Sequence, residues 1–139
     1  MAAVIGPNAA KRELVPSGTW GNTITVHASI TLAALAKDTT AAICKIPGNS
    51  VLLEFRHSSA DLGTSVDGAF ILEEVDDDTA TTTLITEADM ATAATVGAYT
   101  GAAVDVDNDS YIAISNDATT NAMTGLIDIV VQYRYLGGE

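Results

Sequence analysis

Residues 124–136 alternate apolar and polar side chains, and this period of two constrains the fold more than any other feature of the sequence. The apolar members of one parity are Ile127, Ile129, Val131, Tyr133 and Tyr135. Between them stand Asp128, Gln132 and Arg134, while Leu126 and Val130 add apolar area to the second face. Such a pattern is typical of a β-strand that buries one face. Because the segment comes late in the chain, it is predicted to be a central strand that pairs with much earlier strands.

A second alternating segment covers residues 23–32. Its apolar positions are Ile24, Val26, Ala28, Ile30 and Leu32. Shorter segments with strand character are separated by turn residues such as those at 47–49. These predicted strands cover residues 39–46, 51–56, 66–72, 81–86, 104–106 and 111–115. Roughly seven or eight short strands with little helix predict an all-β fold, an antiparallel β-sandwich with jelly-roll-like topology.

Two stretches are less regular than the predicted strands. Residues 33–38 fit either a short helical turn or a plain connection, and residues 87–94 are predicted to form a short helical turn. The predicted core takes one alternating set from each strand. Its members are Ile24, Val26, Ile30, Leu53, Phe55, Phe70, Ile112, Ile114, Ile129, Val131 and Tyr133.

Length and charge limit the classes of partner. The 139 residues suit one domain with a core that needs no disulfides. The 18 acidic and six basic residues give a net charge of −12, so no nucleic-acid or membrane partner is expected. No segment approaches the ~20 apolar residues of a membrane helix, and no signal-like start is seen, so synthesis in a cytosol is expected. The lone Cys44 lies in an apolar run and is predicted to be a small buried hydrophobe.

Residues 1–20 are predicted to form an extended N-terminal arm, and residues 21–139 are predicted to form the β-sandwich domain. Gly6, Pro7 and Pro16 leave the arm without helix or strand periodicity. A segment of this kind is expected to become ordered on the surface of a partner. The residues predicted to make that contact are Val4, Ile5, Lys11, Arg12, Leu14, Val15 and Trp20. The two basic residues among them suit an acidic partner.

Asp105, Asp107 and Asp109 have the spacing of the first ligands in a calcium loop. A helix-loop-helix calcium site also needs Gly at its sixth position and Glu at its twelfth, where this chain has Ser110 and Asn116. A solvated turn is therefore the preferred interpretation, and the three aspartates at 76–78 are interpreted in the same way. No metal site and no cofactor are expected.

The two histidines, His27 and His57, have no neighbouring ligand set for zinc, and no Gly-x-Ser-x-Gly motif marks a nucleophile. The sequence therefore predicts no catalytic residues and no enzyme activity. Trp20 and Tyr99 leave open a surface on which a sugar could stack, although core packing is the more common use of such aromatic residues.

Three segments resemble the head decoration, or cement, proteins of tailed bacteriophages. They are residues 46–52 (IPGNSVL), 62–65 (LGTS) and 124–133 (TGLIDIVVQY), and they follow an extended N-terminal arm. The resemblance covers residues 43–135, and the acidic run at 76–78 departs from it. It implies a non-enzymatic virion protein that decorates and stabilises the outer surface of a bacteriophage capsid. The implied partners are the major capsid protein and further copies of the chain in a homotrimer.

Two other classes of protein stay open at this point. One is a phage tail or fibre component that binds a host surface glycan, and the other is a small hydrolase. Clustered exposed aromatic residues would favour the glycan binder. A buried carboxylate or histidine with a strongly shifted pKa in a cleft would favour the hydrolase.

Overall fold

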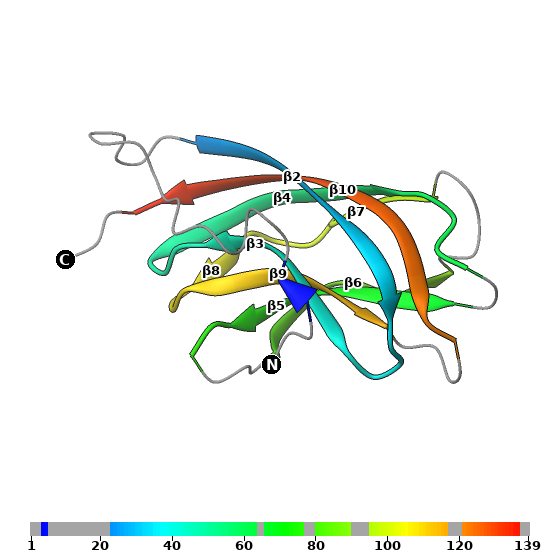
Figure 1. Cartoon of the computed structure of the whole chain (residues 1–139). Coiled ribbons are helices and arrows are strands. Elements are labelled where there is room, and N and C mark those ends of the chain that lie inside the picture. The colour runs from blue at the N-terminus through cyan, green and yellow to red at the C-terminus, as the bar shows by residue number, and fades with distance from the viewer. Residues whose placement is uncertain are drawn as a thin grey trace.

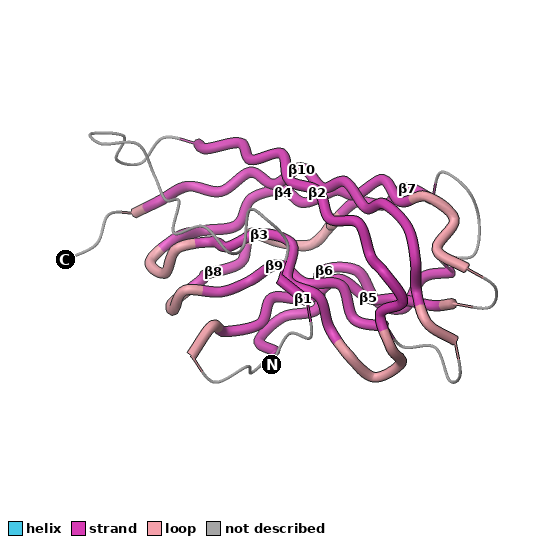
Figure 2. Tube along the Cα trace, viewed as in Figure 1, coloured by secondary structure: helices cyan, strands magenta, loops and turns pink. Residues whose placement is uncertain are grey.

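The computed structural model describes residues 4–5, 23–63, 66–76, 80–89, 95–116 and 121–136, and these residues form strands, turns and loops without a helix. The strands are β1 (Val4–Ile5), β2 (Thr23–Leu35), β3 (Thr40–Ile46), β4 (Ser50–Ser59), β5 (Asp67–Glu74), β6 (Ala80–Asp89), β7 (Thr95–Ala98), β8 (Val104–Val106), β9 (Ser110–Asn116) and β10 (Met123–Tyr135). They form two layers, one above the other in Figure 1, and Figure 2 shows strand in both layers. The predicted all-β sandwich is confirmed.

Two sheets make up the sandwich, and we name each after a strand in its interior. The β10 sheet has the order β2-β10-β4-β7, with β8 also paired to β4, and the β9 sheet has the order β1-β3-β9-β5-β6. The chain passes repeatedly from one sheet to the other, as in a jelly roll. Strand β10 lies between β2 and β4, which confirms the predicted central strand. Every pair is antiparallel except β1 with β3, which is parallel.

The core lies between the sheets and contains most of the predicted side chains. Eight of the predicted core residues are buried, namely Ile30, Phe55, Phe70, Ile112, Ile114, Ile129, Val131 and Tyr133. Ile24 and Val26 are partly buried and pack against the same cluster. Burying side chains of this size stabilises the fold by roughly 1.5–3 kcal/mol each.

The prediction that Leu53 faces the core is wrong. Leu52 is fully buried and Leu53 is only half-buried, although Phe55 is buried as expected. The register between β10 and β4 shifts at this point, because Gln132 pairs with Glu54 whereas Tyr133 pairs with Leu52. One extra residue in β4 forms a β-bulge, and a bulge changes which parity faces inward.

The predicted helical turn at 87–94 is also wrong where it can be compared. Residues 87–89 belong to β6, and residues 90–94 lie outside the described part of the chain. Pairing extends to the end of β6, where Asp67 stands opposite Asp89. Cross-strand pairing therefore outweighs the weak helical preference of this segment.

Residues 33–38, which the sequence left open, contain the end of β2 and a turn. Strand β2 continues to Leu35, and the chain then turns into β3. Ala34 and Asp38 have φ values of 60° and 58°, in the left-handed region. The amide of Asn116 holds this corner, since its Nδ2 donates to the Leu35 carbonyl oxygen at 2.9 Å and to the Asn121 carbonyl oxygen at 3.0 Å.

Candidate functional site

The predicted arm contacts are only partly within the described structure. Val4 and Ile5 form β1, which pairs in parallel with Ala41 and Ala42 at the edge of the β9 sheet. Lys11, Arg12, Leu14, Val15 and Trp20 lie outside the described residues. What the structure shows is that the β3 edge accepts an extended segment through main-chain hydrogen bonds.

The predicted acidic turn between β8 and β9 supports the packing of two loops. An Asp109 carboxylate oxygen accepts a hydrogen bond from the Gly48 amide at 2.7 Å, and its other oxygen lies 3.9 Å from the Lys45 ammonium nitrogen. A Cβ atom on Gly48 would lie 2.9 Å from the Asp107 carbonyl oxygen, so only glycine fits there. Asp105 and Asp107 are exposed. Within the described ranges no three His, Cys, Asp or Glu side chains gather as metal ligands would.

The two histidines lie in different environments. His27 is exposed in β2, and its Nε2 atom lies 3.7 Å from an Asp128 carboxylate oxygen. His57 is only 4% exposed, and its Nδ1 atom shares a 2.9 Å hydrogen bond with the Ser59 hydroxyl. The His57 ring centroid is 4.4 Å from that of Phe70. His57 is therefore part of the core, close to the β7 edge where it pairs with Gly97.

Burial changes the acid–base properties of two core groups. Desolvation lowers the pKa of the His57 imidazole from its ordinary value of 6.5, because the charged form is disfavoured away from water. The same effect raises the pKa of the Cys44 thiol to about 12. Cys44 is free and buried, so it stays protonated and acts as the small hydrophobe that the sequence predicts.

The buried imidazole predicts a pH-dependent stability. Above the unfolded-state pKa of about 6.5, His57 is neutral in both states and contributes no pH dependence. As the pH falls through that value, the unfolded chain binds a proton while folded His57 stays neutral, so the free energy of unfolding decreases. Urea unfolding at about pH 7.5 and about pH 5.5 is expected to show this loss in the native protein and a smaller loss in His57→Gln. The exposed His27→Gln variant is the matched control, and a flattened profile in that variant alone would contradict the assignment.

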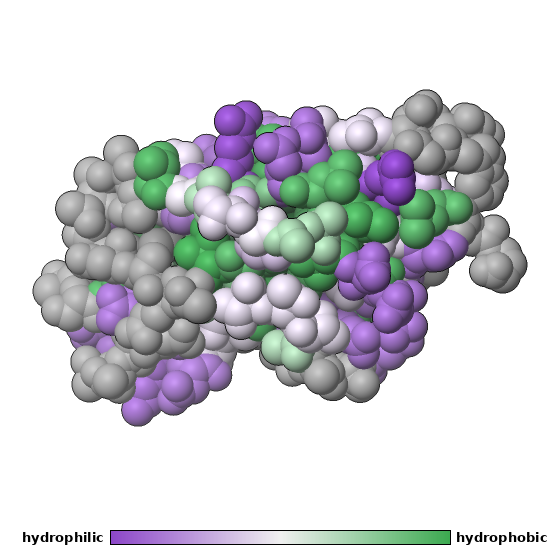
Figure 3. All heavy atoms as spheres, turned by 180° about the vertical axis from the view of Figure 1, so that it is seen from behind, coloured by the Kyte–Doolittle hydropathy of each residue, from purple (hydrophilic) through white to green (hydrophobic). Residues whose placement is uncertain are grey.

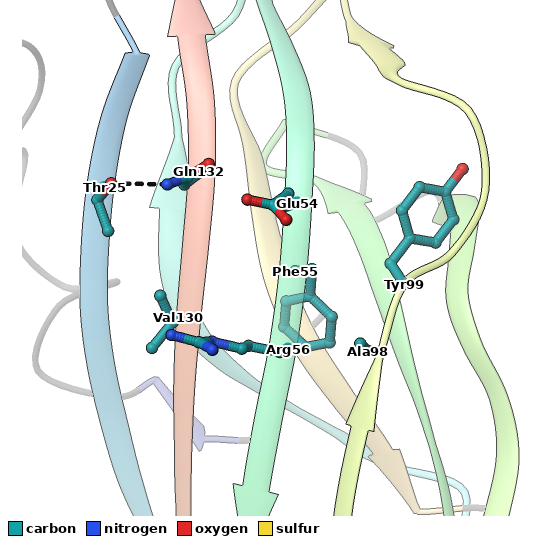
Figure 4. A pocket seen from close by; sticks show the side chains of 8 residues that line it. All are labelled: Thr25, Glu54, Phe55, Arg56, Ala98, Tyr99, Val130 and Gln132. Carbon is teal, nitrogen blue, oxygen red and sulfur yellow. Dashed lines mark hydrogen bonds between the residues drawn. The ribbon is translucent and has the colours of Figure 1, made fainter.

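The outward face of the β10 sheet carries a hollow of about 200 Å³. Its lining comes from neighbouring chain segments, namely Thr25 of β2, Val130 and Gln132 of β10, Glu54 to Arg56 of β4, and Ala98 with Tyr99 at the end of β7. Figure 4 shows these side chains following one another across the sheet. Phe55 lies behind β4, since it is 1% exposed and points into the core.

The hollow lies where the edge strand next to β4 is interrupted. Strand β7 pairs with residues 56–59 of β4, and β8 pairs with residues 50–52. Between them the only main-chain bond to β4 runs from the Tyr99 amide to the Phe55 carbonyl oxygen, at 2.8 Å, within the described residues. The β-bulge at Leu53 falls in the same gap. Bulge and interruption together open the face between Glu54 and Tyr99.

Several polar side chains of this hollow have donors or acceptors without a partner among the described residues. Gln132 donates from Nε2 to the Thr25 hydroxyl at 3.3 Å, as the dashed line in Figure 4 shows, and its amide oxygen accepts no hydrogen bond from the described part of the chain. Glu54 and Arg56 are exposed and have no hydrogen bond or ion pair with any other described residue. The Arg56 side chain extends toward Val130 on β10, which places its apolar stem over the sheet.

Tyr99 is held in place at the end of the hollow. Its hydroxyl donates to the Ala102 carbonyl oxygen at 2.7 Å, and its ring packs against the core while remaining half-exposed. A Cβ atom on Gly101 would lie 2.4 Å from the Tyr99 hydroxyl oxygen, so the loop closes over that hydroxyl because residue 101 is glycine. Figure 4 shows the ring with its face turned to the viewer. The ring is therefore a fixed platform.

A second hollow of about 520 Å³ continues the first and shares Arg56, Ala98 and Val130 with it. Val96 and Asp128 also line it, and Val96 is 71% exposed. Figure 3 views both layers from the side opposite to Figure 1, so the outward face of the β10 sheet is seen there only along the upper margin. The two hollows together form one groove, which we call the β10-face groove.

Sequence reasoning found only part of this groove. The sequence marks Tyr99 as a possible stacking residue, whereas Gln132 is only a polar position of a predicted strand and Glu54 and Arg56 lie in the predicted strand 51–56 without an assigned role. The bulge and the interrupted edge depend on pairing between distant segments, so no local pattern indicates them. Among the described residues, no helix is long and apolar enough to cross a membrane.

The jelly-roll sandwich is shared with chains of solved phage capsid structures. No family model matches this sequence, and no curated protein matches it. A chain in the capsid of Ralstonia phage GP4 is similar with a TM-score of 0.68 and 19% identity, covering 92% of this chain and 93% of that chain. A chain of the cyanophage Pam1 capsid asymmetric unit is similar with a TM-score of 0.60 and 20% identity, covering 91% of this chain and 94% of that chain. A chain in the acid-stable capsid structure of Helicobacter pylori bacteriophage KHP30 is similar with a TM-score of 0.52 and 10% identity, covering 83% of this chain and 89% of that chain. At these identities the similarity establishes the fold.

Proposed function

We propose that this chain is a structural protein of a bacteriophage virion that attaches to the outer surface of the capsid and stabilises it. The observation that carries the proposal is the similarity to the Ralstonia phage GP4 capsid chain, which spans 92% of this chain and 93% of that one. Because the similarity covers nearly the whole of both chains, the two sandwiches match as a whole and not only in one fragment. The resemblance of residues 46–52 and 124–133 to decoration proteins supports the same role.

The architecture suits a protein that clamps a shell. The two packed sheets form a rigid body, and the β3 edge already pairs with the extended segment Val4–Ile5. A neighbouring chain could be held by the same kind of main-chain bonds. In the proposal, the arm residues Lys11, Arg12, Leu14, Val15 and Trp20 contact the major capsid protein. Three copies assemble as a homotrimer, so that weak contacts repeated around the shell add up.

The buried His57–Ser59 pair supports a non-enzymatic role. A hydrolase would need its serine within reach of a substrate, but Ser59 is 1% exposed and His57 is 4% exposed. The described groups beside the imidazole include the Ser59 hydroxyl, the rings of Phe55 and Phe70 and the backbone of Gly97, none of which is charged. The lowered pKa of His57 therefore follows from core burial, and no carboxylate of the described residues forms an ion pair with the imidazole to orient it as a base.

Co-sedimentation with capsids tests this proposal. Purified protein is mixed with capsids assembled from the major capsid protein of the same phage but lacking this chain. Saturable co-sedimentation is expected, with higher thermal stability of the decorated shells. Sedimentation velocity of the free protein is expected to show three copies. Absence of binding would refute decoration, and a monomer both free and on the shell would refute the trimer.

A further inference from the structure

We propose that the β10-face groove binds a neutral oligosaccharide. This inference goes beyond attachment to a capsid, and it rests on the chemistry of the groove rather than on the fold. A sugar ring presents an apolar face of C–H groups and a rim of hydroxyls that both donate and accept hydrogen bonds. A binding site for it therefore needs an exposed aromatic face beside planar polar side chains.

The groove supplies both parts. Tyr99 provides a half-exposed ring, and its bond to the Ala102 carbonyl oxygen fixes the ring before any ligand arrives. The carboxylate of Glu54 lies on the neighbouring strand β4, and the guanidinium of Arg56 and the amide of Gln132 follow over β10, all on the same face of the sheet. A carboxylate accepts, a guanidinium donates, and an amide does both, which matches the hydroxyl rim of a sugar.

The charge balance selects a neutral ligand. The chain as a whole carries a net charge of −12, which disfavours acidic polysaccharides. Within the groove, the charges of Glu54 and Asp128 are partly balanced by Arg56. Uncharged polar groups, Thr25 and Gln132, occupy the far end. A neutral hydroxyl-rich ligand meets no net repulsion at this surface.

The dimensions of the groove fit several linked sugars. It crosses from β2 over β10 and β4 to the end of β7. Neighbouring strands lie about 4.8 Å apart, so three such steps span about 14 Å. That length suits a short oligosaccharide rather than a single ring. The adjoining hollow of about 520 Å³ near Val96 gives room for the chain to continue.

Titration of the full-length protein with defined oligosaccharides tests the proposal without any capsid present. The probes are hexamers of glucose in α-1,4 and β-1,4 linkage, of mannose, and of N-acetylglucosamine, with oligogalacturonate as the acidic comparison. Amide chemical-shift changes and calorimetry are expected to show binding of at least one neutral hexamer, with the shifts centred on residues 54–56, 98–99 and 130–132. Oligogalacturonate is expected not to bind.

Four variants test whether binding depends on the groove rather than on another part of the sheet. Tyr99→Ala and Gln132→Ala are expected to weaken binding about tenfold or more, which corresponds to about 1.4 kcal/mol. Gly101→Ala should weaken it as well, because it displaces the Tyr99 hydroxyl without removing any group from the groove. Thr31→Ala, at an exposed position of β2 outside the groove, is the matched control and should bind normally.

Three outcomes would overturn the proposal. They are no binding of any neutral hexamer, binding that survives in both Tyr99→Ala and Gln132→Ala, and self-association through this face that the groove variants abolish. The last outcome would assign the groove to a second copy of the chain. Because only purified protein is used, failure here leaves capsid binding untouched, and failure of capsid binding leaves this result standing.

Discussion

Removing residues 1–17 is expected to abolish co-sedimentation with capsids while leaving a folded sandwich. The described core lies entirely within residues 23–136, so the truncated chain keeps its hydrophobic cluster. Truncation also removes β1, which contributes only Val4–Ile5 at the edge of the β9 sheet. Ordering an arm on a partner requires roughly 1–2 kcal/mol per residue in lost entropy. An arm that binds must therefore make extensive contact, and its loss should weaken attachment at least a hundredfold, or about 2.7 kcal/mol.

Charge variants test how much the basic residues of the arm contribute to capsid binding. Lys11→Glu combined with Arg12→Glu should weaken binding in a salt-dependent manner, since it reverses the only basic pair in an acidic chain. Lys37→Glu changes an exposed lysine in the turn after β2 and is the matched control. Circular dichroism and urea unfolding check that each variant remains folded. If the truncated and full-length proteins co-sediment equally, the arm has no role in attachment.

Replacing Phe70 with alanine is expected to cause the largest loss of stability of any single substitution considered for this protein. The Phe70 side chain is 0% exposed, and its ring centroid lies 5.1 Å from that of Phe55 and 4.4 Å from that of His57. Truncation removes these ring contacts and leaves a cavity between the two sheets. Substitutions of this kind decrease the free energy of unfolding by about 3–5 kcal/mol.

Urea unfolding of two further variants tests the cause of that loss. Phe70→Leu keeps most of the volume and should lose less than about half as much. Val96→Ala, at a position 71% exposed, should change the free energy of unfolding by less than about 0.5 kcal/mol. Similar losses for Phe70→Ala and Val96→Ala would contradict the placement of Phe70 at the centre of the core.

Alternation in the sequence was sufficient to predict most strands and most of the core. Ile129 and Val131 lie in a regular strand, so their parity alone predicted burial correctly. The prediction that Leu53 faces the core was wrong because a bulge inserts one residue, and alternation on one side of a bulge does not predict burial on the other. The prediction for the end of β6 was wrong for a related reason, since its conformation depends on pairing with the start of β5, where Asp67 stands opposite Asp89.

The candidate groove was harder to predict than the core. Glu54, Arg56 and Gln132 each look like ordinary solvent-facing strand residues, and their proximity arises only when β4 and β10 pair in register. The role of Gly101 is likewise visible only from the closeness of its backbone to the Tyr99 hydroxyl. Sequence patterns report which face of a strand is buried, whereas a surface site depends on which strands become neighbours.

The interrupted edge at β7 and β8 also limits how copies of this protein can polymerise. End-to-end stacking of sheets into a fibre requires an open edge at each side of the sheet, so that every copy offers one edge and accepts another. Among the described strands of the β10 sheet, β2 is a continuous edge of 13 residues, but the opposite edge is split into strands of four and three residues. When two copies pair through their β2 edges, neither has a second continuous edge in this sheet to which a third copy could add. A chain built in this way can accumulate to high concentration with little tendency to form fibres through this sheet.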